Sequence, residues 1–285
     1  MLAGCRFLLL GLLLVGFALP ATAQPAGFTM QGAFRAARVK GDLLSTLTGL
    51  SWRPGLCLAG GRLDVGQTRS LALYLQADVR YGVVASAGGS GFDLDLRLRD
   101  DEGTVVSRDT SADDTPILEF TVPVAGRYVL QLSLVGGPEP NVPACLAVLR
   151  EGGADLQAAT LEAAFVELFA VAGSRDQPLT NGGWLDRPDQ WSFYGFVLER
   201  NDGISLDGLR LGQGGRTLFA SSSPGIDNLD LYLGSANGAI IARDRTDSYR
   251  VTLSLEVTDD EPLSLHLHAP RNREPGVVSI GFFKD

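Results

Sequence analysis

Apolar and polar residues alternate along several short segments of the chain. Residues 92–98 read Phe-Asp-Leu-Asp-Leu-Arg-Leu, and residues 127–134 alternate in the same way. A period of two is typical of a strand with one buried face. Turn residues such as Asp101-Glu102-Gly103 separate these segments. The pattern predicts an all-β fold of antiparallel β-sandwich or jelly-roll type. Residues 34–50 and 156–170 show no strand pattern, and we interpret them as helical or irregular.

The strand pattern occurs twice. Residues 92–109 match residues 227–244 at a constant offset of 135 positions, as in the pair Asp95 and Asp230. A second match, Gly61-Arg62-Leu63-Asp64 with Gly183-Trp184-Leu185-Asp186, has an offset of 122 and predicts extra residues within 199–217. We therefore predict two tandem jelly-roll-like sandwich domains. The boundaries are an N-terminal segment 24–50, domain 1 at 51–150, a linker at 151–160 and domain 2 at 161–285.

These motifs resemble a known bacterial family. Asp-Leu-Asp-Leu-x-Leu, a turn glycine, Arg-Asp, an acidic loop and Ala-Gly-x-Tyr-x-Leu-x-Leu are similar to the pre-peptidase C-terminal (PPC) domain. The match covers 93–109 and 125–134 in the first copy and 228–244 in the second, where Glu261-Pro262-Leu263 replaces Ala-Gly-x-Tyr. The resemblance implies a jelly-roll sandwich related to the collagen-binding modules of secreted collagenases. It also implies a place beside a secreted protease or other catalytic domain.

The first residues have the composition of a secretory signal peptide. Arg6 is the only charge among the first twenty residues, an apolar run follows, and Ala21-Thr22-Ala23 forms an A-x-A cleavage site. We predict cleavage after residue 23 and a periplasmic or extracellular protein, with an anchoring helix as the alternative. No later segment is apolar enough to span a membrane. The two remaining cysteines, Cys57 and Cys145, predict a disulfide, and a pair of free buried thiols is the alternative.

Charge and histidine content narrow the functional classes. The 285 residues carry a formal net charge of −9, which argues against nucleic acid and anionic membranes as partners. His266 and His268 are the only histidines, and no nucleophile elbow, His-Glu-x-x-His or phosphate loop is present. The two histidines could supply half of a zinc site. They align with Gln131 and Ser133 of the first copy, however, which favours a polar strand face. We therefore expect no catalytic residues and no enzyme.

Acidic residues gather around the repeated hairpin of the first copy. Asp101, Asp109, Asp113 and Asp114 are candidate ligands for calcium, which prefers carboxylate and carbonyl oxygens. Solvated turns are also acidic, so the alternative is an ordinary loop. Asp109 recurs as Asp244, which favours a role in bonding the turn or the strand edge. Calcium is the one cofactor that the sequence suggests.

An aromatic cluster in the second copy is the strongest indication of a binding surface. Its candidate partner-binding residues are Trp184, Trp191, Tyr194 and Phe196. At the offset of 122, Phe193 and Val197 take core positions, so that Tyr194 and Phe196 face outward, where aromatic rings can anchor a partner. The alternative is that they are buried. We predict a non-enzymatic secreted or periplasmic protein that recognises a protein or polysaccharide partner at the cell envelope. The alternative function is an accessory module, stabilised by calcium, that acts beside a separate secreted hydrolase.

Overall fold

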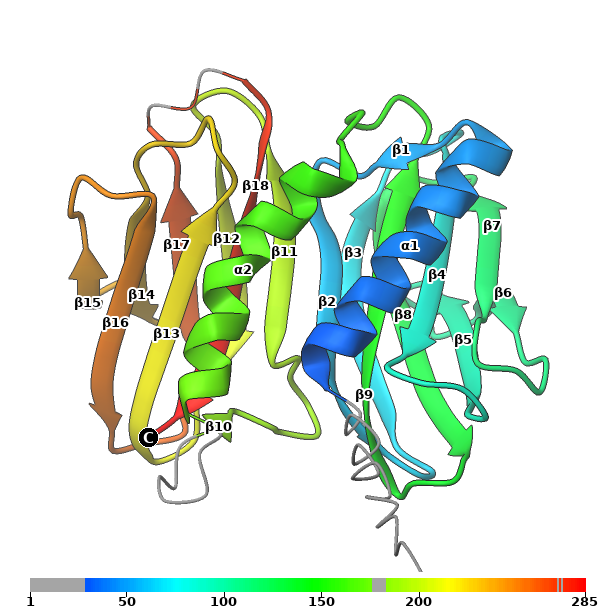
Figure 1. The fold of residues 1–285 in the computed structure, drawn as a ribbon, viewed down its shortest axis with the longest axis horizontal. Coiled ribbons are helices and arrows are strands. Elements are labelled where there is room, and N and C mark those ends of the chain that lie inside the picture. The colour runs from blue at the N-terminus through cyan, green and yellow to red at the C-terminus, as the bar shows by residue number, and fades with distance from the viewer. Residues whose placement is uncertain (1–28, 176–182, 271, 273) are drawn as a thin grey trace, which may run out of the picture.

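The computed structural model describes residues 29–175, 183–270, 272 and 274–285. The predicted signal peptide, residues 1–23, lies outside the described residues. Two helices and two groups of strands follow one another along the chain (Figure 1). Helix α1 (Met30–Thr48) precedes the first sandwich, which consists of β1 (Ser51–Trp52), β2 (Gly55–Asp64), β3 (Thr68–Leu75), β4 (Arg80–Ala87), β5 (Asp93–Arg99), β6 (Val105–Asp109), β7 (Ile117–Thr121), β8 (Gly126–Gly136) and β9 (Asn141–Arg150). Helix α2 (Ala158–Arg175) precedes the second sandwich, which consists of β10 (Gly183–Trp184), β11 (Phe193–Leu198), β12 (Gly203–Leu209), β13 (Gly214–Ser222), β14 (Asp230–Ser235), β15 (Ile240–Asp244), β16 (Arg250–Val257), β17 (Leu263–His268) and β18 (Gly276–Lys284).

Each sandwich is built from two antiparallel sheets with the strand order of a jelly roll. In the first sandwich one sheet has the order β1-β9-β4-β7, with β2 also pairing β9, and the other has the order β3-β8-β5-β6. The second sandwich repeats both sheets as β10-β18-β13-β16, with β11 on β18, and β12-β17-β14-β15. From β2 to β9 and from β11 to β18 the chain alternates between the facing sheets, as in jelly rolls, except at the hairpins β5–β6 and β14–β15, which each stay within one sheet. The predicted fold class, two tandem jelly-roll-like sandwiches, is confirmed.

Strand pairing gives the alignment between the two copies and corrects one part of the sequence prediction. Leu96 pairs with Leu132 as Leu231 pairs with Leu267, which confirms the offset of 135. In the same way β1 corresponds to β10, since Trp52 pairs with Leu149 as Trp184 pairs with Phe283. The predicted match of Gly61–Asp64 with Gly183–Asp186 is therefore wrong. The counterpart of β2 is β11, because both pair with the last strand of their sandwich.

Both helices bury the same kind of face. Thr29 caps α1 by accepting a hydrogen bond from the Gly32 amide at 3.0 Å, and Gly49 ends the helix at φ 73°, a left-handed conformation that suits glycine. The buried positions of both helices recur three or four residues apart, which is the period of an amphipathic helix. They are Met30, Ala33, Phe34, Ala37, Gly41 and Leu44 in α1, and Leu161, Ala164, Phe165, Leu168 and Ala172 in α2. Residues 158–160 of the predicted linker form the first turn of α2.

The helices lie on the same side of the molecule, each across one sheet (Figure 1). Helix α1 packs on β4 and β9, and α2 packs on β13 and β18. We call these two sheets the helix-covered sheets and the other two the open sheets. The rings of Phe34 and Phe165 stack with centroids 4.3 Å apart, so the two helices also touch each other. A second apolar cluster thus lies between the helices and the helix-covered sheets.

One continuous hydrophobic cluster fills the interiors of both sandwiches. Strands β2 and β11 lie side by side where the sandwiches meet (Figure 1), and an isolated bridge joins Pro54 to Val197. Gly60 allows this close approach, because a Cβ atom there would overlap the ring of Phe193. The two copies therefore share one core across their boundary.

Candidate functional site

The four aromatic residues predicted to bind a partner are all buried. Trp184, Trp191, Tyr194 and Phe196 are 8%, 1%, 7% and 1% exposed. Trp184 lies between the helices and the sheet, with its ring centroid 4.7 Å from that of Phe283. The prediction of an exposed aromatic surface is wrong. The physical reason is that β11 is covered on both faces, by the helices on one side and by the sandwich interior on the other.

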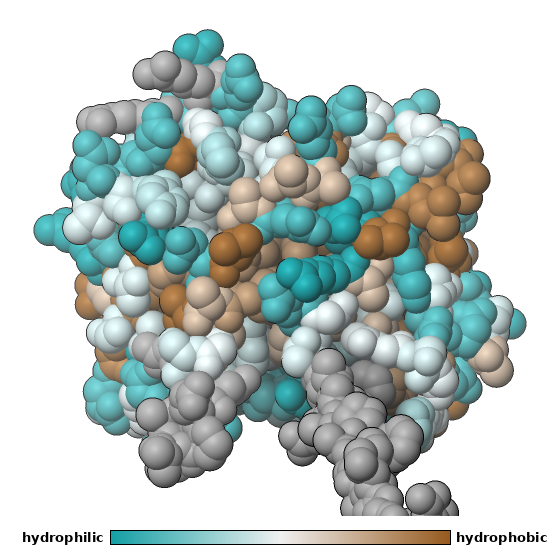
Figure 2. Space-filling view, viewed as in Figure 1, coloured by the Kyte–Doolittle hydropathy of each residue, from teal (hydrophilic) through white to brown (hydrophobic). Residues whose placement is uncertain are grey.

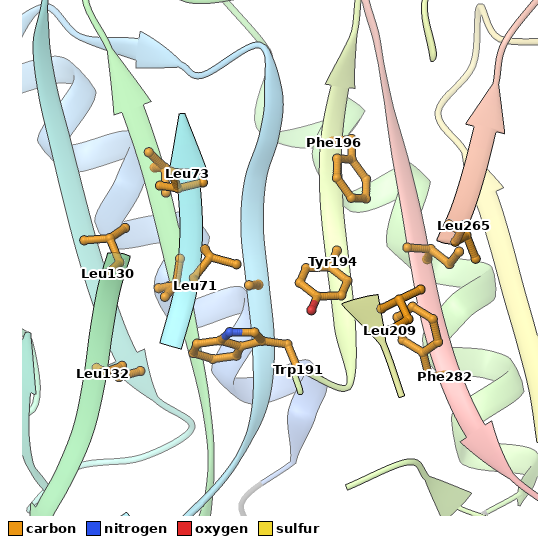
Figure 3. Packing of buried hydrophobic residues seen from close by; sticks show 14 of the residues in the cluster. Leu71, Leu73, Leu130, Leu132, Trp191, Tyr194, Phe196, Leu209, Leu265 and Phe282 are labelled. Atoms are coloured by element: carbon orange, nitrogen blue, oxygen red, sulfur yellow. The ribbon is translucent and has the colours of Figure 1, made fainter. Parts of the chain in front are cut away.

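Trp191 contacts the other sandwich. Its indole Nε1 donates a hydrogen bond to the backbone carbonyl of Ser70 at 2.9 Å. Figure 3 shows the indole reaching toward Leu71 of β3, while Tyr194 and Phe196 on β11 lie nearer to Leu209 and Phe282. Burial raises the pKa of Tyr194 strongly. Trp191 therefore helps to hold the two sandwiches together, whereas Tyr194 and Phe196 pack inside the second one.

The four candidate calcium ligands do not form one site. Asp101 belongs to the turn before β6, whereas Asp109 is the last residue of β6, and Asp113 and Asp114 belong to the loop after it. The five residues of β6 separate the two groups by about 13 Å, at about 3.3 Å per residue. No three metal-ligating side chains converge anywhere in residues 29–175, 183–270, 272 or 274–285.

The carboxylates after β6 bond their own loop. Asp109 accepts hydrogen bonds from the amide of Ser111 at 3.1 Å and from the amide of Ile117 at 2.9 Å. Asp113 accepts one from the amide of Thr115 at 2.9 Å, and Asp114 receives the ammonium of Lys40 at 3.5 Å. This is the turn-bonding role that the recurrence of Asp109 predicted.

The two cysteines are free thiols, which contradicts the predicted disulfide. Both side chains are fully buried between the helix and sheet layers. In the β2–β9 register Cys145 lies opposite Gly60, three residues from Cys57 along the strand. That displacement is about 10 Å, whereas a disulfide requires Cα atoms within about 7 Å.

The two histidines lie on the solvent side of the second open sheet. His266 and His268 are exposed, and His266 Nδ1 is 2.7 Å from the hydroxyl of Ser205. Their strand positions match Gln131 and Ser133, because Tyr232 pairs with His266 as Arg97 pairs with Gln131. The polar-face interpretation therefore fits their surroundings.

A pocket with a volume of about 430 Å³ opens beside α2, where β13 ends and β16 begins. Its size lies within the usual range of ligand sites, about 300–1,000 Å³. We call it the α2 pocket. Its lining residues are Ala163, Val166 and Glu167 of α2, Ser222, Ser223, Pro224, Ile226 and Asp227 after β13, and Tyr249 before β16.

Internal hydrogen bonds hold the floor of the α2 pocket in place. The hydroxyl of Ser222 donates to the carbonyl of Ile226 at 2.9 Å, and the hydroxyl of Ser223 accepts from the amide of Val277 at 3.0 Å. Ile226 is 1% exposed and anchors the loop in the core. The pocket is therefore preformed by the fold.

Charged groups stand at the mouth of the α2 pocket. The guanidinium of Arg250 lies 5.1 Å from the ring centroid of Tyr249 and 3.3 Å from the carboxylate of Glu167. The first of these contacts is a cation–π interaction. Asp227 is exposed and has no hydrogen-bond or ion-pair partner among the residues that the structure describes. Two carboxylates and one guanidinium thus surround an apolar wall.

Sequence reasoning missed the α2 pocket, although the repeat contained a signal for it. At the offset of 135, Ile226 and Tyr249 of the second sandwich correspond to Gly91 and Asp114 of the first. The corresponding hollow of the first sandwich is lined by Gly91, Phe92, Asp113 and Asp114 among others. At these two positions the second copy has apolar side chains where the first has a glycine and an aspartate, whereas Phe92 of the first copy stands where the second has Asp227.

Figure 2 shows the face of the molecule that carries both helices. Apolar atoms gather there at the end of α1, where Val39, Leu43 and Leu47 are 52%, 57% and 74% exposed. These three residues recur every four positions and form a stripe along the helix. Helices α1 and α2 are both too short or too polar to cross a membrane, and no other helix occurs among the described residues.

Comparisons with known proteins do not identify a family. No protein-family profile matches the sequence, and no curated protein sequence matches it. Among solved structures, the periplasmic g-type lysozyme inhibitor PliG of Aeromonas hydrophila is 17% identical, with a TM-score of 0.26 over 35% of this chain and 96% of that one. The PBSX exported protein XepA is 11% identical, with a TM-score of 0.26 over 79% and 85% of the two chains. The tandem CBM51 modules of Sp3GH98 from Streptococcus pneumoniae are 10% identical, with a TM-score of 0.23 over 79% and 83%. Likeness at this level carries no argument about function.

Proposed function

We propose that this chain is a non-enzymatic binding protein of the periplasm or the extracellular space, related to the PPC domain, that recognises a protein or polysaccharide partner through the α2 pocket. The observation that carries the proposal is the apolar pocket itself. It is preformed, and Val166 and Tyr249 at its mouth are 59% and 42% exposed. Exposed apolar side chains around a concave site are typical of recognition surfaces.

The repeat supports a functional origin for the pocket. Both sandwiches have the same strand order, and the first adopts it with Gly91 and Asp114 at the two positions in question. Ile226 is a core residue of the second sandwich, but the jelly roll does not require a tyrosine at position 249. Selection for an apolar ligand gives a reason for the exposed ring of Tyr249.

A binding assay with matched variants tests the proposal. The purified protein would be immobilised and exposed to a polysaccharide panel and to the envelope proteins of its source cell. We expect Tyr249→Ala to lower retention of one partner at least tenfold. Tyr74→Ala is the matched control, because Tyr74 is 65% exposed on β3 of the other sandwich. Equal retention by both variants, or turnover of a panel member, would contradict the proposal.

A further inference from the structure

We infer that the occupant of the α2 pocket is a protein segment that carries a large apolar side chain next to a basic residue. This inference rests on the proposed function and names the class of partner. It follows from three features of the site: which polar groups are already bonded, where the charges lie, and how the two sandwiches differ.

The floor of the α2 pocket offers few free hydrogen-bonding groups. The hydroxyl of Ser222 is bonded to the carbonyls of Ile226 and Tyr249 at 2.9 and 3.3 Å. The hydroxyl of Ser223 accepts from Val277, and its amide donates to the carbonyl of Val277 at 2.8 Å. A sugar ring carries several hydroxyl groups that need partners when they leave water. An apolar side chain has no such requirement, so this floor favours it.

Tyr249 forms one wall of the pocket. Arg250 lies over its ring, and the same guanidinium is tied to Glu167 of α2. This chain of contacts joins the start of β16 to the helix and holds the ring beside Val166. Aromatic rings held in this way bury large apolar anchors with little loss of side-chain entropy.

The mouth of the pocket favours a positive charge. Asp227 is exposed and has no partner among the described residues, and Glu167 shares its carboxylate with Arg250 in a part-exposed pair. The whole chain has a net charge of −9, which adds a long-range attraction for basic ligands. A lysine or arginine next to the apolar anchor could pair with Asp227.

The first sandwich provides an internal comparison. Its equivalent hollow has Asp114 in place of Tyr249, and the ammonium of Lys40 of α1 already pairs with the carboxylate of Asp114. The negative charge at that position is thus satisfied within the chain, and the position carries no aromatic ring. The substitution Tyr249→Asp therefore reproduces the first sandwich's side chain in the second pocket.

Peptide selection provides the test. A random heptapeptide phage library would be panned on the full chain, with the Tyr249→Asp protein in solution as competitor. We expect a consensus of a large apolar residue adjacent to Arg or Lys. The synthetic consensus peptide should bind at least tenfold more weakly to Tyr249→Asp and to Val166→Glu, and a few-fold more weakly to Asp227→Asn. Leu43→Glu on α1 is the matched control and should bind normally.

The outcomes separate this inference from the proposed function. The expected consensus, with its loss in both pocket variants, would support the inference. Selection of no consensus, or of one without the apolar–basic pair, would overturn it, as would unchanged binding by folded Tyr249→Asp and Val166→Glu proteins. If the polysaccharide panel then showed retention that Tyr249→Ala abolishes, the proposed function would stand and the partner class would be wrong. Melting curves of all variants would establish that each is folded.

Discussion

Arg69 of the first sandwich forms an ion pair with Asp186 of the second. Arg69 is 2% exposed, and its guanidinium also donates to the backbone carbonyl of Gln190. Burial lowers the pKa of Arg69, and the charge of Asp186 opposes that shift. Next to this pair, Trp191 donates to the carbonyl of Ser70. Because one hydrophobic cluster continues across this boundary, the two sandwiches form a single cooperative unit.

The first prediction concerns this ion pair. Asp186→Ala leaves a buried guanidinium unpaired, so we expect a loss of stability of about 3–5 kcal/mol. Urea unfolding followed by tryptophan fluorescence and by far-UV circular dichroism should give coincident single transitions. Glu119→Ala is the control, because its pair with Arg80 is exposed and should contribute less than about 1 kcal/mol. Two separate transitions in the unsubstituted protein would refute the cooperative unit.

The second prediction concerns the close approach of β2 and β11. A Cβ atom at Gly60 would overlap the ring of Phe193, so Gly60→Ala should destabilise the protein by about 1–3 kcal/mol. Adding Phe193→Leu should recover part of that loss, because it removes the clashing ring atoms. Gly126→Ala is the control, since nothing lies within 4 Å of its added Cβ. Strictly additive losses in the double variant, measured by urea unfolding, would count against this account.

The fold class and the repeat could be predicted from the sequence because β5 and β14 each have one buried face. Both strands keep the alternation of apolar and polar residues. The offset of 135 also aligns the paired residues of β13, β14 and β17 with those of β4, β5 and β8, whereas β18 is shifted by one residue relative to β9. The offset of 122 gave a wrong alignment of the strands before β3 and β12. The true counterparts β1 and β10 are only two residues long, so their sequences carry no periodic signal. A four-residue resemblance between Gly61–Asp64 and Gly183–Asp186 then outweighed the true correspondence.

The candidate site could not be predicted for a different reason. Every residue of β11 is buried, so the alternation that separates an inner from an outer face is absent there. Aromatic residues predicted to be a binding surface are instead the shared core. Tyr249 lies in an acidic, polar loop with no motif around it, and only its alignment with Asp114 distinguishes it. The repeat in the sequence gives this alignment. The difference between Asp114 and Tyr249 indicates a pocket only once the structure places α2 beside Tyr249.

The third prediction concerns the two thiols. Burial raises the pKa of Cys57 to about 12, so almost no thiolate exists at pH 8. Ellman's reagent should therefore not label the native protein that lacks residues 1–23. In guanidinium without reductant it should label both Cys57 and Cys145. If no free thiols were detected in the denatured protein, Cys57 and Cys145 would form a disulfide after all.

The fourth prediction concerns calcium. The carboxylates of Asp109 and Asp113 already accept backbone hydrogen bonds, and Asp101 lies at the other end of β6. We therefore expect 1 mM calcium to leave the melting temperature unchanged relative to EDTA. A calcium-dependent rise would indicate binding to the folded state by linkage, and would favour the accessory-module alternative.

Asp109 and Asp244 occupy equivalent positions and make equivalent bonds. The side chain of Asp109 accepts from Ser111 and from the amide of Ile117, while that of Asp244 accepts from Thr246 and from the amide of Thr252 at 2.9 Å. Burial alone would raise both pKa values, but these hydrogen bonds outweigh it and hold the pKa of each carboxyl below 3.8, its ordinary value. Each carboxylate fastens the loop that leads into the edge strand of a helix-covered sheet.

The fifth prediction follows from the sign of those shifts. A carboxyl whose pKa is lower in the folded state stabilises the protein above its unfolded pKa, and this stabilisation is lost as the pH falls from about 4 through the folded pKa. Asp109→Asn and Asp244→Asn should each lower the free energy of unfolding at pH 7 by about 1–2 kcal/mol. The difference from the unsubstituted protein should shrink toward pH 2, where its own carboxyls are protonated. Urea unfolding at pH 7, 4 and 2 measures both effects. Asp101→Asn, at an exposed turn position, is the control and should leave the free energy of unfolding unchanged at every pH. If the Asp109 or Asp244 variant lost the same free energy of unfolding at pH 7 and at pH 2, the carboxylate charge would not contribute to stability.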